Sequence, residues 1–236
     1  IASTLSHVCS FFYSKKIFFC FLFSSFIYIC YKNRYADEMA LRAAHGFKQY
    51  QRQDLVGGRY SLVGTLHDNE YEPVKSSVVL HPDFWVTFLW KRIVGNSVLN
   101  ATLSMSTPKT VRAYAHCGKP PSAFHVSGWE NGEKTAGTLI LINLDNSTST
   151  TALNVNEITE YIRWTLTSGV DSVNPFGTNV YLNGKQLESI VSNGKPIENV
   201  PVAGVKGEGG NISLPPLSVS FIVVKGIDAN ILEQCI

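Results

Sequence analysis

One short segment of this sequence has the residue types and spacing of a ligand-binding edge. Gln53 precedes the run Gly57-Gly58-Arg59-Tyr60, where a predicted strand meets two glycines and an aromatic residue. Two consecutive glycines let the backbone approach a ligand or turn sharply. Barrel enzymes place such segments at the carboxyl ends of their strands, where substrates bind. A plain tight turn with a packed Tyr60 fits the same spacing, so both interpretations stay open.

Motifs for other kinds of chemistry are absent from the sequence. It contains no G-x-S-x-G, H-E-x-x-H, P-loop or C-x-x-C motif. His116, Cys117 and His125 do not have a metal-ligand spacing, and we interpret them as structural residues. The acidic residues that could look like pairs fall in polar turns, where solvated carboxylates are common: Asp68, Glu70, Glu72, Glu130, Glu133 and Asp145. We interpret Asp37 and Glu38 as charges in the first turn of a helix. We therefore expect neither a metal nor a cofactor.

The charge of the chain is distributed unevenly. The whole sequence has 20 Lys+Arg and 18 Asp+Glu, and residues 1–34 hold four of the basic residues and none of the acidic ones. The body from residue 35 onward is therefore slightly acidic. This near-neutral balance excludes a broad basic face for nucleic acid, and the 44% of hydrophobic residues excludes a disordered composition.

Residues 17–31 form an uncharged, Phe-rich stretch after Lys15 and Lys16. At about 1.5 Å per residue, a helix of this length is shorter than a membrane span requires. A signal or anchor segment with possible membrane association is one interpretation. The stretch could instead belong to a larger domain. The abrupt change in composition after Arg34 favours a third interpretation, a sequence foreign to the fold, such as a mis-spliced exon.

The next part of the chain has the pattern of alternating strands and helices. We predict a short helix over residues 35–44, strands over 47–56 and 59–66, and a loop over 68–80. His81-Pro82-Asp83 opens a helix whose apolar residues recur every three or four positions, and Gly95 ends it. Trp85 and Trp90 lie on or beside its apolar face and are predicted core residues. This order fits the last βα units of an α/β barrel.

After residue 95 the hydrophobic pattern changes to a period of two. Predicted strands cover residues 98–104, 110–116, 138–143, 161–167, 178–182 and 218–225. They are separated by turn signals such as Asn183-Gly184 and the glycine-rich residues 207–210. We expect an antiparallel β-sandwich. The predicted domains are therefore residues 1–34, an unmatched leader; 35–96, a barrel fragment; and 97–236, the sandwich.

Cysteines and glycosylation signals favour an oxidising compartment. Cys117 and Cys235 could form a bridge, which would stabilise the fold by about 4–5 kcal/mol because its loop is long. Two unrelated free thiols are the alternative. Three N-x-S/T sequons begin at Asn100, Asn146 and Asn211, at strand ends or in loops. We therefore expect the secretory pathway, with an extracellular, cell-wall, vacuolar, lysosomal or membrane-associated destination.

Several ordered motifs resemble plant heparanase-like proteins, which belong to glycoside hydrolase family 79. Residues 52–60 (RQDLVGGRY) are similar to the family's R-Q-x-L-[IV]-G-G-N-Y, and residues 111–117 (VRAYAHC) to its L-R-A-Y-A-H-C. Residues 81–95 resemble its N-P-D-Y-Y…L-W-H-R-L-M-G helix. LINLDN, YLNG and LPPLSVSFIVV follow in the family's order. The resemblance covers some 200 residues from about residue 35, and leaves out the leader.

The resemblance implies a retaining β-glucuronidase with a (β/α)8 barrel followed by a β-sandwich. Such enzymes use two glutamates about 5–5.5 Å apart. In this family both glutamates precede the R-Q-x-L segment, and the nucleophile falls shortly before the helix that corresponds to residues 35–44. This chain has the acid-free leader at those positions. Gln53, Gly58 and Tyr60 match positions that line the uronic-acid subsite, whereas Arg59 replaces the family's Asn. Cys117 and Cys235 match the family's sandwich disulfide.

These observations predict a C-terminal portion of a heparanase-like β-glucuronidase. Its expected partner is a glucuronic-acid-containing polysaccharide or glycoside. As this chain alone has neither catalytic glutamate, we expect it to be inactive by itself. The alternative hypothesis is a non-catalytic carbohydrate-binding or interaction module built on the sandwich.

Overall fold

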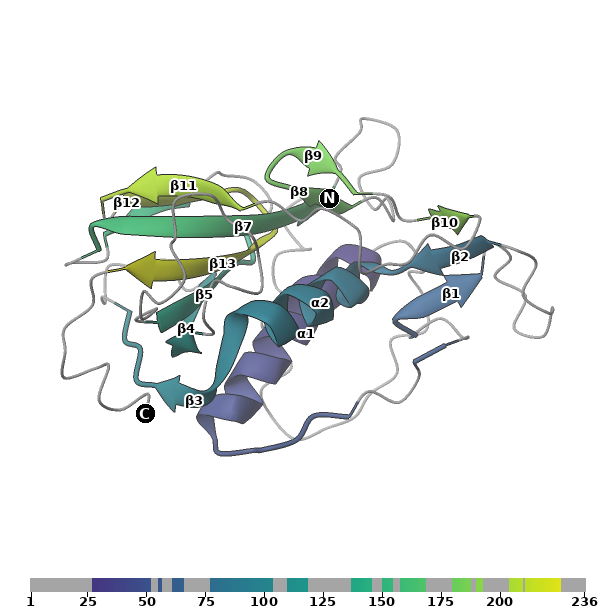
Figure 1. The fold of residues 1–236 in the computed structure, drawn as a ribbon, viewed down its shortest axis with the longest axis horizontal. Helices are drawn as coiled ribbons and strands as arrows, with labels where there is room; N and C mark the ends of the chain where they lie inside the picture. Colours follow the sequence, from purple (N-terminus) through teal and green to yellow (C-terminus); the bar gives the residue numbers. More distant parts are fainter. Residues whose placement is uncertain are drawn as a thin grey trace, which may run out of the picture.

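The computed structural model describes two helices and thirteen strands (Figure 1). The described residues are 27–51, 55–56, 61–65, 77–103, 110–118, 137–145, 150–154, 158–168, 180–187, 190–192, 204–209 and 211–225. Predictions that concern other residues, including the leader up to residue 26, lie outside this set. No helix among the described residues is long and apolar enough to span a membrane.

Helix α1 (Ile27–Ala44) begins eight residues earlier than predicted and runs through the change in composition after Arg34. It therefore includes residues 27–31 of the Phe-rich stretch. Its last turn is followed by Gly46, whose φ of 83° suits a helix terminus, since glycine adopts positive φ without strain. Asp37 and Glu38 lie in the interior of the helix, and not in its first turn as the predicted boundary implied.

Helix α2 (Pro82–Ile93) confirms the clearest helix of the sequence. His81 is its extended N-cap, Pro82 stands at the first helical position, and Asp83 lies in the first turn. Trp85 is fully buried and Trp90 packs against the same core, as the periodicity predicted. The chain passes from Ile93 directly into the next strand, so the helix ends two residues before Gly95.

An antiparallel sheet is the largest element of the described structure. Its eight described strands are β3 (Val94–Leu99), β4 (Val111–Gly118), β5 (Gly137–Asn143), β13 (Ser218–Lys225), β7 (Glu160–Ser168), β8 (Val180–Leu182), β9 (Lys185–Gln186) and β11 (Val205–Glu208). The first seven follow one another in this order, and β11 pairs with β7. The central strand β13 pairs with β5 and β7 along almost its whole length. Six of these strands overlap the strands predicted from the period of two.

The Asn183-Gly184 turn joins β8 to β9, as predicted. Both residues have positive φ, 50° and 81°, which a two-residue hairpin turn of this kind requires. The Asn183 side chain stabilises the turn: its Oδ1 accepts from Thr165 N at 2.8 Å, and its Nδ2 donates to Arg163 O at 3.2 Å. Residues 207–210 are only partly a turn, because Gly207 lies within β11.

Two smaller sheets flank the large one. Strands β1 (Val63–Thr65), β2 (Ser77–Leu80) and β10 (Ile190–Ser192) form one, in that order, with antiparallel pairing. Strands β6 (Thr150–Asn154) and β12 (Asn211–Leu214) form the other. The predicted loop over 68–80 is thus wrong at its end, since β2 occupies Ser77–Leu80 and pairs on both sides. The sequence prediction also missed β6, β9, β10, β11 and β12.

The core lies on both faces of the eight-stranded sheet. One face packs against α1 and α2, which lie side by side over it in Figure 1; Trp85, Trp164 and Phe221 are fully buried there. The other face packs against the β6–β12 pair through Ile212 and Leu214. Both faces of β5 and β13 are therefore apolar, which explains their almost uninterrupted hydrophobic sequences.

The described structure is therefore rich in antiparallel β-sheet, as the prediction for the second half of the chain required. The strand predicted over 47–56 is wrong for residues 47–51, which form no strand; only Val56 makes an isolated bridge, parallel, with Val63. All pairs between the described strands are antiparallel. The barrel fragment and the complete sandwich stay predictions.

Candidate functional site

The predicted binding residues Gln53, Gly58 and Tyr60 lie outside the described residues, but both flanks of the run 57–60 are described. Val63 N donates to Leu55 O at 3.0 Å, and Val56 forms a parallel bridge with Val63. Residues 55–56 and 63 are therefore held together by backbone bonds. The two glycines indicated a turn or a binding edge at this place. They did not indicate the backbone bonds between its two flanks, because such bonds can form between residues of any type.

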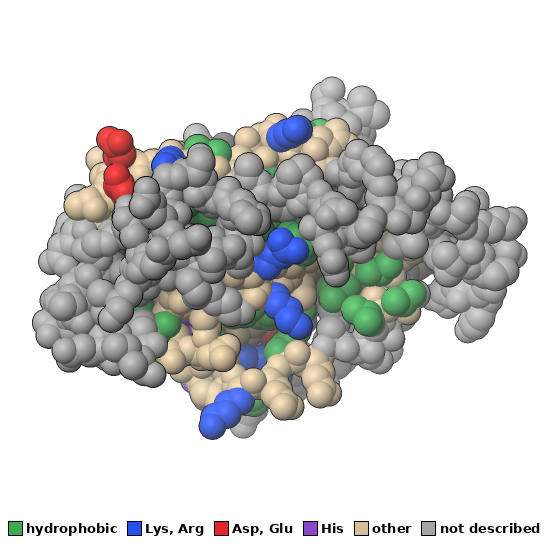
Figure 2. Space-filling model, in the orientation of Figure 1, with side chains coloured by type: hydrophobic (Ala, Val, Ile, Leu, Met, Phe, Trp, Pro, Cys, Tyr) green, Lys and Arg blue, Asp and Glu red, His purple; other side chains and the backbone are tan. Residues whose placement is uncertain are grey.

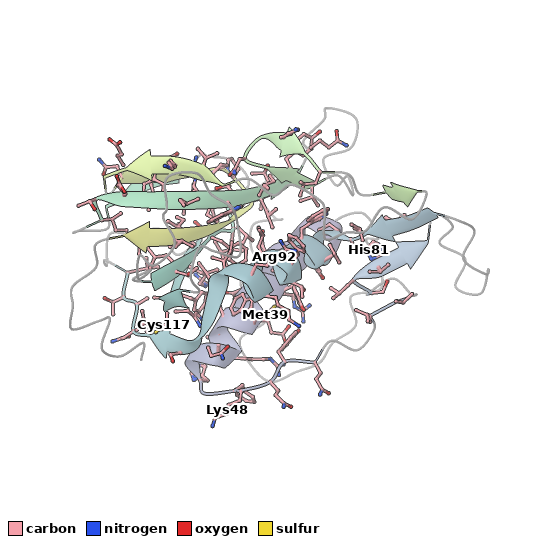
Figure 3. All side chains as sticks on the ribbon, viewed as in Figure 1. Met39, Lys48, His81, Arg92 and Cys117 are labelled. Carbon is pink, nitrogen blue, oxygen red and sulfur yellow. The ribbon has the colours of Figure 1, made fainter. Side chains whose placement is uncertain are left out.

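His81 holds the residues that follow this run. Its Nδ1 lies 2.7 Å from Ser61 O, and its backbone N donates to Leu62 O at 3.0 Å. A carbonyl oxygen only accepts, so Nδ1 carries the proton and donates. Figure 3 labels His81 at the start of α2, beside β1 and β2. From the sequence, His81 was predicted only to begin the helix. A histidine at this position does not by itself indicate contacts with Ser61 and Leu62.

Gly64 lets the His81 ring lie against β1. A Cβ atom built on Gly64 would be 2.6 Å from His81 Nε2, closer than such atoms approach. The ring therefore packs directly over the backbone of the strand. The N-terminus of α2 and the segment 61–64 form one unit, fixed by two hydrogen bonds and this contact.

Apolar side chains reach the surface on the same flank. Leu55 is 67% exposed and Val56 is 62% exposed, although both are large aliphatic residues. Figure 2 shows hydrophobic side chains gathered beside β1. Exposed aliphatic residues next to a glycine-rich run suit contact with the apolar face of a sugar or with another protein surface.

The described carboxylates near the helices contact other protein groups. Tyr114 OH donates to Asp37 Oδ1 at 2.5 Å, which joins α1 to β4. Glu38 forms a salt bridge with Arg42 at 2.7 Å. Arg42 also lies over the ring of Tyr50, 5.3 Å from its centroid. Among the described residues, no group of three or more His, Cys, Asp or Glu is placed to hold a metal ion.

The remaining predicted site residues are described only in part. Cys117 is buried and forms a disulfide bond. Its partner is not among the described side chains, and Cys235 lies outside the described residues, so their pairing stays a prediction. Asn100 and Asn211 are described and exposed, whereas Asn146 lies outside. Exposure is what a glycosylation acceptor needs, but it does not show modification.

Comparison with known proteins gives relatives over most of the chain. Heparanase-like protein 2 of Arabidopsis thaliana is 28% identical over an alignment of 229 positions, which covers 83% of this chain and 37% of that protein. Heparanase of Gallus gallus is 28% identical over 199 residues, 82% of this chain and 33% of that protein. Hyaluronoglucuronidase of Hirudo nipponia is 30% identical over 199 residues, 84% of this chain and 36% of that protein.

No family model matches the chain. A family 51 alpha-L-arabinofuranosidase from Bifidobacterium longum is similar in structure with a TM-score of 0.45 and 13% identity, over 84% of this chain and 35% of the other, a likeness too low to support an argument. The relatives found by sequence agree with one another and with the motifs. Over most of its own length this chain is thus heparanase-like in sequence, and it spans about a third of the length of the curated relatives it matches.

Proposed function

We propose that this chain is the C-terminal portion of a glycosidase that cleaves glucuronic-acid-containing glycans. The observation that carries the proposal is the sequence similarity to heparanases and a hyaluronoglucuronidase over more than four-fifths of the chain. The motif order, from the RQDLVGGRY segment to the VRAYAHC strand, supports the same assignment.

In this proposal Gln53, Gly58 and Tyr60 line one side of the uronic-acid subsite. The bonds of His81 to Ser61 and Leu62 support it, because they fix the backbone that directly follows Tyr60. A subsite residue contributes most to binding when its backbone is held in place before the sugar arrives. The exposed Leu55 and Val56 border the same run.

We expect that this polypeptide alone does not hydrolyse glycosidic bonds. A retaining glycosidase needs one carboxyl group as acid and base and a second as nucleophile. Residues 1–34 contain neither Asp nor Glu. The described carboxylates of α1 contact Tyr114 and Arg42, so they do not replace the missing pair.

Binding and turnover are tested separately on the 236-residue chain. We expect no release of p-nitrophenol from p-nitrophenyl β-glucuronide, and we expect binding of a glucuronate-containing oligosaccharide. Gln53→Ala and Tyr60→Ala should each weaken this binding about tenfold, whereas Gln51→Ala, at an exposed position two residues before Gln53, should not. Turnover would overturn the inactivity, and equal binding by all variants would overturn the subsite.

A non-catalytic carbohydrate-binding module is the second candidate. The observation that favours it is the eight-stranded sheet, which has a hydrophobic cluster on each face. Deleting residues 35–95 would not separate the two candidates, because α1 and α2 cover one of those faces. Point variants separate the two candidates. If Gln53→Ala and Tyr60→Ala leave glycan binding unchanged, the chain binds glycan through another surface, as a module would.

We also propose that the protein is made in the secretory pathway and is delivered outside the cell or to a vacuolar or lysosomal compartment. The exposed Asn100 and Asn211 sequons and the disulfide bond of Cys117 support this localisation. The predicted Cys117–Cys235 bridge is part of the same proposal.

A further inference from the structure

His116 is an ionisable residue inside the contact between a helix and the main sheet. It lies on β4, its side chain is 2% exposed, and it faces the helix layer together with Tyr114. The ring packs against Trp90 of α2 with centroids 5.3 Å apart, nearly edge to face. Trp90 in turn contacts Phe221 of the central strand β13. The His116 ring therefore belongs to the apolar interior.

Within the described structure, neither ring nitrogen of His116 makes a hydrogen bond of good geometry. A neutral imidazole without partners already forfeits hydrogen bonds to water. A protonated one would carry two N–H donors and a positive charge, and the backbone of Gly95 offsets only part of the cost of burying that charge. Geometry alone therefore favours the neutral ring in the folded chain.

The described elements around His116 offer no carboxylate to compensate a charge on its ring. Strands β3 and β5, which pair with β4 on either side, contain no ionisable side chain. On α1, Asp37 accepts a bond from Tyr114, and Glu38 pairs with Arg42. On α2, Asp83 lies in the first turn, about two helical turns from Trp90.

The cations on the neighbouring helix α2 and on β4 itself are Lys91, Arg92 and Arg112. Arg92 lies over the Phe88 ring at 4.2 Å, and Lys91 is exposed. On β4 itself, Arg112 donates to Val111 O, and Cys117 is disulfide-bonded. The carboxyl end of α2 would attract a cation, but Ile93 O already accepts from Thr138, the residue paired with His116 across the sheet.

We propose that His116 is an acid-sensitive latch: protonation of its ring releases the last turns of α2 from the sheet. In the neutral state the ring fills the space between Trp90 and the sheet. When charged, it must reach water, and the path to water opens between α2 and β4. The latch itself does not depend on the proposed function.

The direction of the pH dependence follows from burial. Desolvation lowers the pKa of His116 from its ordinary value of 6.5, and the nearby Gly95 backbone offsets part of this effect. The unfolded chain therefore takes up the proton at a higher pH than the folded chain. The stabilisation is fully present above about pH 6.5 and is lost as the pH falls from there through the lower pKa of the folded state.

Two measurements on the full chain test the latch. In the NMR spectrum, the His116 ring should titrate below pH 6.5, and comparison with the spectrum of His116→Gln assigns its signals. As the pH falls from 7.5 to 5, the folding equilibrium constant should fall by about tenfold for each pH unit between 6.5 and the pKa of folded His116, or between 6.5 and 5 if that pKa is lower. Amide exchange in the last turns of α2 should accelerate over the same range, and exchange in β13 should not.

Variants distinguish the effect of His116 from a loss of stability at low pH that has other causes. His116→Gln and His116→Phe cannot acquire a charge, and Phe also keeps an aromatic ring against Trp90. Both should lose the His116 part of the pH dependence, whereas His45→Gln, at an exposed position, should keep it. A His116 pKa at or above 6.5 would overturn the proposal, and so would variants with unchanged pH dependence. If neither variant folds, the titration of the wild-type ring decides.

Discussion

At the scale of single residues, His81 is the side chain whose role changed most between sequence and structure. The sequence indicated a helix start, and the structure adds a bond to Ser61 O at 2.7 Å and packing over Gly64. One partly buried ring therefore fixes the relative position of a helix and a strand. A side chain with this role is sensitive to replacement by one that cannot donate.

We predict that His81→Ala lowers the free energy of unfolding by about 1 kcal/mol, because Ser61 O loses its donor. His81→Asn should recover most of this loss, since Asn supplies an N–H donor and is a preferred N-cap residue. Denaturant unfolding of the three proteins measures the difference. Equal stability of the Ala and Asn variants would contradict the role of the side-chain bond.

Gly95 is the second residue for which the structure makes a sharp prediction. A Cβ atom there would lie 2.2 Å from the carbonyl oxygen of Cys117, a backbone atom that cannot move aside cheaply. Gly95→Ala should therefore destabilise the chain by about 1–3 kcal/mol through displacement of β3 from β4, which denaturant unfolding measures. Ser97→Ala, at an exposed position of the same strand, is the matched control and should change stability by less than about 0.5 kcal/mol.

At the scale of elements, α1 connects the predicted leader to the body. Its Asn33 is buried, and Asn33 Nδ2 donates to Asn143 O at 3.4 Å. Asn143 Nδ2 in turn donates to Leu214 O and Pro215 O on the far side of the sheet. Two residues before the change in composition, the chain is therefore already joined to the core of the sheet.

We predict that a chain beginning at residue 35 is less stable than one beginning at residue 27, by roughly 1–3 kcal/mol, because it loses the Asn33 bond and two turns of α1. Chemical unfolding of the two truncated chains gives the difference. Asn33→Ala in the longer chain should account for part of the loss. If the two chains unfold at the same denaturant concentration, residues 27–34 do not contribute to the fold.

At the scale of the whole molecule, the two helices and the β6–β12 pair bury opposite faces of one antiparallel sheet. This leaves the sequon residues Asn100 and Asn211 exposed, outside both apolar interfaces. The arrangement explains how a chain with 44% hydrophobic residues can still present glycosylation acceptors.

We predict that expression in a secretory host gives a chain carrying N-linked glycan, detected as a loss of apparent mass after enzymatic deglycosylation. Asn100→Gln and Asn211→Gln should each remove one step of this mass, because both acceptors are accessible. Ala101→Ser is the matched control, since it keeps the Asn100 sequon and should leave the pattern unchanged. A secreted chain without glycan would contradict the prediction.

The sequence by itself determined the helix α2, the longer strands and the family resemblance. Apolar residues at helical spacing located α2 within two residues of its ends, and the period of two located β4, β5, β7 and β13. The run VRAYAHC and the Gly57-Gly58 pair pointed to heparanase-like proteins. Such features are visible in sequence because they depend on neighbouring residues along the chain.

Only the tertiary structure decided which distant residues meet. Short strands such as β9 and β10 have too few residues for a clear period, and β2 follows a polar stretch that resembled a loop. The contacts of His81 with Ser61, of Asn33 with Asn143, and of His116 with Trp90 join residues far apart in the sequence. These contacts depend on burial and geometry between elements, which residue type and spacing do not encode.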